Sequence, residues 1–287
     1  MEDKILKDNI EKYKLSEDEH KKVLEQLKEK LFTNKHHQNN PSIMFVVGQP
    51  GCGKTTYIGS ANLSNYIIIN SDNYRKYHKC SKEILVKYPT YYATFTNFDA
   101  HLWGDELFSY AIQNDYSVLR EKAPTDYSLI DLISTIPKNY DIVINVVVRG
   151  NLSSLLATRE RYEKEILSSN TAKLSNIETH NICYDLLPDF ILKCLSLGVT
   201  VNYIVPVDRE FKTISVTLDN YLSLLQNLRD ESNEQTCLNY DVRINKIKND
   251  MIKRSAPKDQ FVELEKIENE FIKYVTDNYI NIEKKLY

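Results

Sequence analysis

The chain has 287 residues, of which 42% are hydrophobic and 27% are charged, as in an ordinary water-soluble globular protein. This length allows one large domain, or one domain with a sizeable extension. The formal net charge of -3 argues against a global positive field that would attract nucleic acid or anionic membrane. No apolar run approaches the roughly 20 residues of a membrane-spanning helix. We therefore expect neither nucleic acid nor membrane as a partner.

The N-terminus and the cysteines indicate the compartment. The charged start MEDKILKDNIEKYK lacks the apolar stretch of a secretory signal. The five cysteines are scattered and contain no C-x-x-C pair, a pattern that disfavours a disulfide framework and a zinc site. Both features predict a reduced, cytoplasmic protein.

Residues 15–32 are predicted to form a helix, because apolar residues recur on one face and Ser16 with Glu19 fits a capping box. The polar residues 33–41 interrupt this pattern and indicate a loop. His36 and His37 in this loop have no carboxylate or thiol nearby at ligand spacing, so we interpret them as solvated residues.

From residue 42 the pattern changes to short apolar runs that alternate with amphipathic segments. The apolar runs are nearly continuous, as in strands that are buried on both faces of a parallel sheet. They comprise residues 43–47, 66–70, 141–148 and 199–207, with a weaker candidate at 116–122. Helices are expected between them at residues 54–61, 81–87, 99–114, 152–168 and 178–197. This order predicts an α/β fold of three layers, with a mostly parallel sheet and right-handed crossovers.

Beyond about residue 215 the strand patterns end and helical patterns continue. Residues 259–284 place a row of apolar side chains on one helix face, namely Leu264, Ile267, Phe271, Val275 and Tyr279. Such a segment is either a helical cap on the core, which we favour, or a separate tail that binds a partner. The chain is therefore divided into an N-terminal helical part, a central α/β domain and a C-terminal helical extension, at residues 1–40, 41–214 and 215–287.

The most specific chemical signal is GQPGCGKT at residues 48–55, which matches G-x-x-x-x-G-K-[ST] and follows a predicted strand. Its glycines let successive backbone N–H groups turn toward phosphate oxygens. Lys54 is expected to contact the β- and γ-phosphates, and the Thr55 hydroxyl to ligate Mg²⁺. Cys52 is interpreted as a bystander. The expected nucleotide-binding residues are Gly48, Gln49, Pro50, Gly51, Cys52, Gly53, Lys54, Thr55 and Thr56.

A phosphate loop is shared by switches, motors and small-molecule kinases. We find no N-K-x-D segment of the kind that reads the guanine base in GTPases. No strongly apolar run ends in Asp-Glu or a clear equivalent, as it does in many motor ATPases. These two features favour a kinase.

Asp72 follows the strand predicted at residues 66–70, at the edge of the sheet where the phosphate loop also lies. A carboxylate there can take the proton of an attacking hydroxyl or hold a magnesium-bound water. The alternative is that Asp72 caps the next helix; we favour the catalytic role. Glu106 and Glu121 are further candidates for substrate binding, each with a solvated surface Glu as the alternative.

A cluster of basic residues lies in and after the helix predicted at residues 152–168. Basic groups here would neutralise charge on the transferred phosphoryl group, as in a lid. The alternative is a set of i,i+4 salt bridges with neighbouring glutamates, and the sequence leaves the two interpretations open. The basic residues are Arg159, Arg161, Lys164 and Lys173, and the glutamates are Glu160, Glu163 and Glu165.

Over roughly residues 15–207, the order of five motifs resembles the zeta toxin family of bacterial toxin–antitoxin systems. The motifs are GQPGCGKT, IIINSDNYR, TRERYEKE, SSNTAK and THNICYDLLPDF. The resemblance implies a phosphate-loop kinase-like α/β domain that uses ATP and Mg²⁺. It also implies phosphorylation of a hydroxyl of the amino-sugar in UDP-N-acetylglucosamine, and a small helical antitoxin that blocks the ATP site.

The resemblance assigns roles to individual residues of this chain. Lys54 and Thr55 match the phosphate-loop lysine and hydroxyl, Asp72 matches an aspartate that resembles a general base, and Arg161 matches the arginine of E-R-Y. In place of a second lid arginine stands Lys173, which we add to the nucleotide-binding residues. His180 and Leu187-Pro188 match structural landmarks.

The substrate side departs from the family pattern. Glu106 lies one residue from the position of the family's substrate-side glutamate, and Asp105 is the alternative. Glu121 resembles the glutamate that ends the next strand. There the family often continues with Gly-Thr, which contacts substrate, whereas this chain has Lys122 and Ala123.

The sequence thus predicts an ATP- and Mg²⁺-dependent kinase with Asp72, Lys54 and Arg161 as catalytic residues and UDP-N-acetylglucosamine or a related nucleotide-sugar as acceptor. One alternative is a kinase of another nucleotide metabolite such as NAD, acting as a secreted effector. A second is an inactive ATP-binding module that serves as an interaction partner. Identification of the phosphorylated product separates the nucleotide-sugar kinase from the kinase of another nucleotide metabolite. Any ATP turnover excludes the inactive module.

Overall fold

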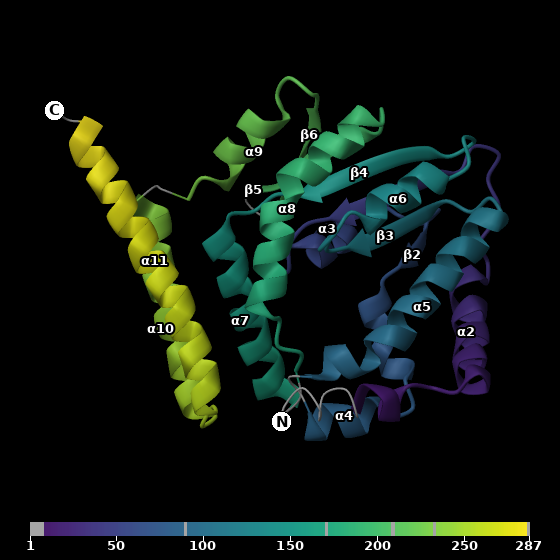
Figure 1. Cartoon of the computed structure of the whole chain (residues 1–287), viewed down its shortest axis with the longest axis horizontal. Helices are drawn as coiled ribbons and strands as arrows, with labels where there is room; N and C mark the ends of the chain where they lie inside the picture. Colours follow the sequence, from purple (N-terminus) through teal and green to yellow (C-terminus); the bar gives the residue numbers. More distant parts are fainter. Residues whose placement is uncertain (1–8, 89–90, 170–171, 208–209, 232–233, 286–287) are drawn as a thin grey trace.

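The computed structural model describes residues 9–88, 91–169, 172–207, 210–231 and 234–285 (Figure 1). Within these residues, six strands form one sheet in the order β2-β3-β1-β4-β5-β6. The first five are parallel, and β6 pairs antiparallel with β5. No described helix is both long and apolar enough to cross a membrane. The strands are β1 Ser42–Val47, β2 Ile67–Ile69, β3 Val118–Lys122, β4 Asp141–Val147, β5 Thr200–Val207 and β6 Glu210–Val216.

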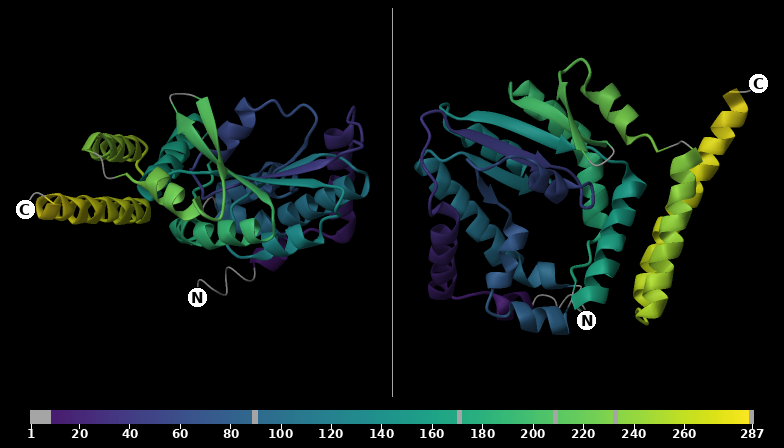
Figure 2. Two further views of the ribbon diagram at one scale, coloured as in Figure 1. Left: turned by 90° about the horizontal axis from the view of Figure 1, so that it is seen from above. Right: turned by 180° about the vertical axis from the view of Figure 1, so that it is seen from behind.

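Helices cover both faces of the sheet, as expected for an α/β fold of three layers (Figures 1 and 2). Two short turns, η1 and η2, follow β2. The helices and turns are α2 Glu17–Phe32, α3 Lys54–Ser60, η1 Ser71–Asn73, η2 Arg75–Tyr77, α4 Ser81–Lys87, α5 Tyr92–Gln113, α6 Ser128–Thr135, α7 Asn151–Ser169, α8 Ile177–Ser196, α9 Tyr221–Arg229, α10 Glu234–Lys253 and α11 Lys258–Lys285.

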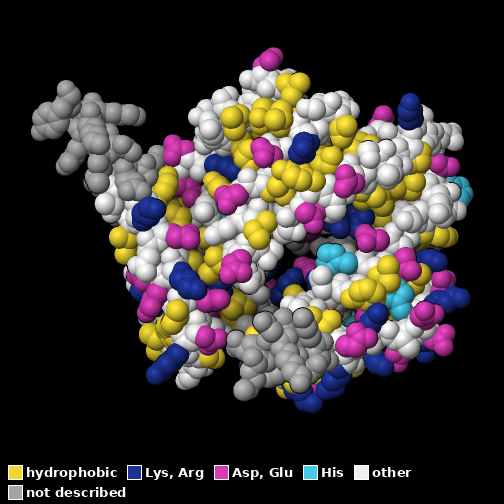
Figure 3. Space-filling model, viewed as in Figure 1, with side chains coloured by type: hydrophobic (Ala, Val, Ile, Leu, Met, Phe, Trp, Pro, Cys, Tyr) yellow, Lys and Arg dark blue, Asp and Glu magenta, His cyan; other side chains and the backbone are white. Residues whose placement is uncertain are grey.

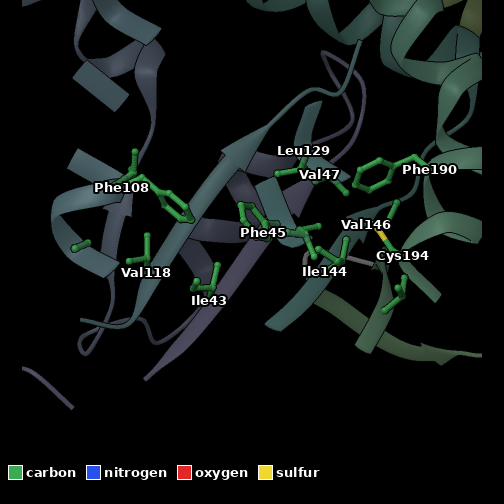
Figure 4. Close-up of a cluster of buried hydrophobic side chains, with 14 of the residues drawn as sticks. Ile43, Phe45, Val47, Phe108, Val118, Leu129, Ile144, Val146, Phe190 and Cys194 are labelled. Carbon is green, nitrogen blue, oxygen red and sulfur yellow. The ribbon is translucent and has the colours of Figure 1, made fainter. Parts of the chain in front are cut away.

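The main core lies between the sheet and helices α5, α6 and α8. Alternate residues of β1, such as Phe45, point toward Phe108 of α5, and Phe190 of α8 joins the same cluster (Figure 4). Val46, between them in the strand, packs on the opposite face with Tyr57 of α3. Burying each large apolar side chain contributes about 1.5–3 kcal/mol. Both faces of the central strands are therefore apolar, which explains the continuous apolar runs.

The N-terminal helix α2 is fixed at both its start and its inner face. Ser16 and Glu19 form the predicted capping box, with Ser16 Oγ accepting from the Glu19 backbone and Glu19 Oε2 from the Ser16 backbone. His20 lies 3.0 Å from Asp99 and 2.8 Å from Glu106, both on α5. These contacts attach α2 to α5, on the outer side of that helix.

The fold class is confirmed; one predicted boundary needs correction, and two elements were not predicted. Helix α5 begins at Tyr92 rather than at residue 99, because Tyr92, Phe95 and Thr96 are buried. Helix α6 and strand β6 were not predicted. Strand β6 pairs on one side only and is largely exposed, so it lacks the continuous apolar run of the buried strands. Helix α6 is only eight residues long, too short for a clear period.

The C-terminal helices α10 and α11 lie side by side and pack against α7 (Figure 2). Leu152, Leu155 and Leu156 of α7 share an apolar cluster with residues of both helices. Of the face predicted for residues 259–284, Leu264 and Ile267 are buried in this cluster and Phe271 packs against it, while the side chains of Val275 and Tyr279 lie outside the described residues. The helical extension thus contacts the rest of the protein through α7.

Candidate functional site

The phosphate loop connects β1 to α3, as its motif predicts. Gly51 and Gly53 have φ angles of 79° and 108°, in the region that favours glycine. A Cβ on Gly51 would collide with the backbone carbonyl of Ser154 in α7, so the loop passes very close to that helix. The loop is therefore supported by α7 as well as by its own strand and helix.

The side chains of the loop differ in their surroundings. Lys54 is buried, and its Nζ donates to the carbonyl oxygens of Gly48 at 2.7 Å and Gln49 at 3.1 Å. Gln49 is fully buried and donates to the carbonyl oxygen of Arg149. Thr55, at the start of α3, is exposed. Burial raises the pKa of the Cys52 thiol, which keeps it protonated and agrees with its interpretation as a bystander.

Asp72 lies just beyond the carboxyl end of β2, in turn η1. Its carboxylate accepts hydrogen bonds from Arg75 Nε at 2.7 Å and from Lys173 Nζ at 2.9 Å. The side chain that caps the turn is that of Asn70, which accepts from the Asp72 backbone N–H. The structure therefore gives no support to the helix-cap alternative for Asp72.

The charge state of Asp72 follows from these two partners. Burial alone would raise the pKa of its carboxyl group, but the nearby positive charges of Lys173 and Arg75 outweigh that effect. The pKa of Asp72 is therefore held well below its usual range, and the group is ionised at neutral pH.

Glu121 lies at the end of β3, where the parallel register places it beside Val46 of β1, two residues before the phosphate loop. Its Oε2 accepts from Asn70 Nδ2 at 2.7 Å. Burial raises the pKa of Glu121, the charge of Lys54 opposes this rise, and the charge of Asp72 adds to it. The charges of Lys54 and Asp72 thus both act on the Glu121 carboxyl group.

The two predicted lid residues approach this cluster from α7 and from the segment that follows it. Arg161 Nη2 donates to Ser175 Oγ at 3.1 Å, and the Arg161 side chain is 48% exposed. Lys173 reaches Asp72, as described. The positive charges of both residues oppose the rise in the pKa of Glu121, which agrees with their approach to this carboxyl group.

Three further charged residues of α7 bind the C-terminal helices. Arg159 pairs with Glu263 at 3.0 Å, Glu160 with Arg243 at 2.8 Å and Glu163 with Arg254 at 2.6 Å. The i,i+4 alternative is thus wrong for these three residues. Among the described residues of α7, an i,i+4 pair forms between Arg161 and Glu165, which are 3.9 Å apart. The outer face of α7 therefore binds the C-terminal helices, and its inner face carries Arg161, the predicted lid arginine.

The two candidate substrate-side acids lie in different surroundings. Glu106 contacts His20 and lines a shallow groove of about 380 Å³ between α2 and α5, away from the phosphate loop. Asp105 also lines this groove, and its carboxylate accepts from Arg120 Nη2 on β3. Of the two, Asp105 is the one whose partner comes from a strand of the site.

Sequence reasoning missed Asn70 and Arg75. Asn70 bridges Glu121 and the turn that carries Asp72. Arg75 is buried, and its guanidinium binds Asp72 together with Ala93, Thr96 and Asn97 of α5. The available signal was position, because Asn70 ends a predicted strand and Arg75 follows it closely, on either side of Asp72.

The surface is hollowed between α5 and α7, with acidic, basic and histidine side chains around the hollow (Figure 3). A phosphate loop with its lysine, an ionised carboxylate and two basic side chains meet at one edge of the sheet. This arrangement can hold a polyphosphate, deprotonate a hydroxyl and neutralise a phosphoryl group in transfer.

Comparison with known sequences identifies relatives of this chain. A sequence model of the zeta toxin family matches residues 26–193, which is more than half of the chain. Toxin zeta of Streptococcus agalactiae is 25% identical over 171 residues, which make up 58% of this chain and 60% of that protein. The chain therefore matches less than two thirds of the length of this relative.

Comparison with solved structures shows the same fold. A structure from the PezAT chromosomal toxin-antitoxin system of Streptococcus pneumoniae has a TM-score of 0.69 at 20% identity, covering 82% of this chain and 98% of that chain. The complex AvrRxo1-ORF1:AvrRxo1-ORF2 with sulphate ions has a TM-score of 0.51 at 12% identity, with 81% and 79% covered. The same pair with ATP has a TM-score of 0.50 at 10% identity, with 88% and 84% covered.

Proposed function

This chain belongs to the zeta toxin family, and we propose that it is a kinase that transfers the γ-phosphoryl group of ATP to a hydroxyl of UDP-N-acetylglucosamine or a related nucleotide-sugar. The observation that supports this proposal most strongly is the position of Asp72. An ionised carboxylate lies at the same sheet edge as the phosphate-loop lysine and shares a direct contact with the lid residue Lys173.

Nucleotide binding is assigned to the phosphate loop and the lid. Lys54 Nζ, which now contacts two backbone carbonyl oxygens, would contact the β- and γ-phosphates. Arg161 and Lys173 would approach the γ-phosphoryl group from the side of α7. Thr55 would hold Mg²⁺, since its exposed hydroxyl at the start of α3 is an oxygen donor of the kind this ion prefers. The bound ion would neutralise phosphate charge.

Asp72 would act as the general base. The acceptor oxygen forms its bond to the γ-phosphorus while its proton passes to an Asp72 oxygen, and the bond between the γ-phosphorus and the β,γ-bridging oxygen breaks to release ADP. The contact with Lys173 makes Asp72 a weak base. Attraction of Lys173 to the γ-phosphate would remove this contact and raise the basicity of the carboxylate, so that ATP binding would prepare the base.

The partner and the compartment are also proposals. The similarity to a structure from a toxin-antitoxin system supports a small helical antitoxin as partner of this chain. We place the protein in the cytoplasm, where ATP and nucleotide-sugars are available, and retain secretion as an effector as the alternative.

A second candidate function is phosphorylation of another nucleotide metabolite such as NAD. Lys122 and Ala123 favour it, because this chain lacks the Gly-Thr pair with which the family often contacts the sugar-nucleotide. An inactive ATP-binding module is the third candidate.

Mass spectrometry after incubation of the protein with ATP, Mg²⁺ and a panel of nucleotide-sugars and dinucleotides tests these proposals. Lys54→Ala is the negative variant, and Lys253→Ala, an exposed lysine on α10, is the matched control. We expect a product with one added phosphate on UDP-N-acetylglucosamine, made by the parent and by Lys253→Ala. A product only on a dinucleotide would favour the second function, and no ATP turnover with any acceptor would favour the third.

A further inference from the structure

Lys122 lies beside the phosphate loop. It is the last residue of β3, and the parallel register places it next to Val47, the residue that precedes the phosphate loop. Its side chain is half-buried. An ammonium group at the carboxyl end of a central strand lies at the crevice in which open α/β sheets bind their ligands.

The alternation of β3 directs Lys122 toward α5. Val118, Arg120 and Lys122 share one face of the strand, whereas Glu121 is on the other face with Leu119. Arg120 stacks over Phe108 of α5 and donates to Asp105 of the same helix. Lys122 therefore lies on the α5 side of the hollow, opposite the face from which Glu121 reaches Asn70.

Charge on this side of the hollow is not balanced. Arg120 is paired with Asp105, and Asp126 accepts from the Ser128 backbone at the start of α6. Within the described residues, Lys122 Nζ donates no hydrogen bond and forms no ion pair. The charges that act on it most strongly are the repulsive charge of Arg120 and the weaker attractive charges of Asp105 and Asp126. A half-buried ammonium group without a partner destabilises the folded protein unless a ligand supplies the anion.

His101 of α5 is a further polar side chain on this side of the hollow, but it does not compensate the charge of Lys122. It lies one turn before Asp105 on α5. Burial, together with the positive charges of Lys122 and Arg75, lowers the pKa of His101 to about 4. The imidazole is therefore neutral at pH 7 and available to donate or accept a hydrogen bond, while Lys122 remains the unpaired cation.

We propose that Lys122 binds a phosphate group of the acceptor and thereby restricts the kinase to acceptors that already carry phosphate. A lysine is a compact point charge suited to a phosphate, and Lys122 ends β3 whereas Lys54 begins α3, so the two ammonium groups come from different elements. This inference rests on the proposed function, because it divides the site into a donor side at Lys54 and an acceptor side at Lys122.

The proposal gives acceptor binding a characteristic pH dependence. Burial, followed by the charge of Arg120, lowers the pKa of Lys122 to about 8. The charged form, which binds phosphate, therefore predominates at pH 7 and is lost as the pH rises through about 8. An arginine at this position remains charged throughout that range.

The experiment measures KM for two acceptors, N-acetylglucosamine 1-phosphate and N-acetylglucosamine, in the parent, Lys122→Met and Lys122→Arg. A charge-assisted contact is worth about 1.5–3 kcal/mol, so we expect Lys122→Met to raise KM for the phosphorylated sugar about 10- to 100-fold. KM for the uncharged sugar and the affinity for ATP should stay within a few-fold. Between pH 7 and 9, KM for the phosphorylated sugar should rise in the parent but not in Lys122→Arg.

Equal losses for the two sugars, or no loss for either, would overturn the proposal. Calorimetry separates its failure from that of the proposed function: UDP is titrated into the protein saturated with a non-hydrolysable ATP analogue. If UDP binds the parent and binds Lys122→Met at least about tenfold more weakly, the phosphate contact is supported. This holds even if no acceptor is phosphorylated, a result that would refute only the proposed kinase function. No binding, or equal binding, would refute the role of Lys122.

Discussion

Two regions of this protein concentrate charged side chains, and they use them differently. Where α7 meets α10 and α11, three charged residues of α7 have partners of opposite sign: Arg159 pairs with Glu263, Arg254 binds both oxygens of Glu163, and Arg243 both oxygens of Glu160. In the hollow between α5 and α7, Asp72 is shared by two cations and Arg161 is half exposed.

The difference indicates where ligands act. Paired, partly buried charges with apolar neighbours hold elements together, because loss of one partner leaves the other without compensation. Charges that are shared, exposed or unpaired can exchange protein partners for a ligand. Helix α7 joins the two regions: its outer face is fixed by the C-terminal helices, and its inner face supports the phosphate loop through Ser154 and carries Arg161.

The largest effect on the hollow is expected from Lys54→Ala. The lysine charge is required on the phosphates throughout transfer, so phosphoryl transfer should fall about a thousandfold or more. Growth arrest on expression in bacteria should disappear together with phosphoryl transfer. Lys253→Ala, which changes an exposed lysine of α10, should retain both transfer and growth arrest. Growth arrest that persists in Lys54→Ala would locate toxicity outside the phosphate loop.

A smaller effect is expected from Arg161→Ala. An arginine that engages the moving phosphoryl group acts mainly in the transition state, so kcat should fall about a hundredfold while the affinity for ATP stays within a few-fold. Lys164→Ala, which removes an exposed charge from the same helix, serves as the control. If KM for ATP rises and kcat does not change, Arg161 is only a ground-state contact.

The smallest effect on catalysis is expected from substitutions in the C-terminal helices. Arg254→Ala leaves the buried Glu163 carboxylate without its partner and should lower the free energy of unfolding by about 3 kcal/mol. Lys253→Ala breaks an exposed pair with Asp250 and should cost less than about 1 kcal/mol. Denaturant unfolding of both variants, with kcat measured at a temperature where both are folded, checks this. A large drop in kcat for Arg254→Ala without loss of stability would contradict the division between the regions.

The sequence predicted the parts of this structure that depend on local pattern. The phosphate loop, the buried parallel strands and the capping box of α2 are each encoded by neighbouring residues, and all three are present. Strand β6 was missed because an edge strand needs no continuous apolar run.

The contacts that define the site depend on residues far apart in the chain. Lys173 reaches Asp72 across 101 positions, and Arg254 reaches Glu163 across 91. No local period encodes such pairs, so i,i+4 spacing wrongly suggested partners for Arg159, Glu160 and Glu163. The sequence could place Asp72 at a strand end, but not its two cations.

The central claim is that Asp72 is the base of a phosphoryl transfer, and Asp72→Asn tests it most directly. Asparagine keeps the shape and removes the basic oxygen, so calorimetry should show ATP affinity close to that of the parent. Single-turnover transfer to the identified acceptor should fall by about two to four orders of magnitude. Transfer at nearly the parental rate in Asp72→Asn would contradict the assignment and leave Glu121 or Asp105 as the base.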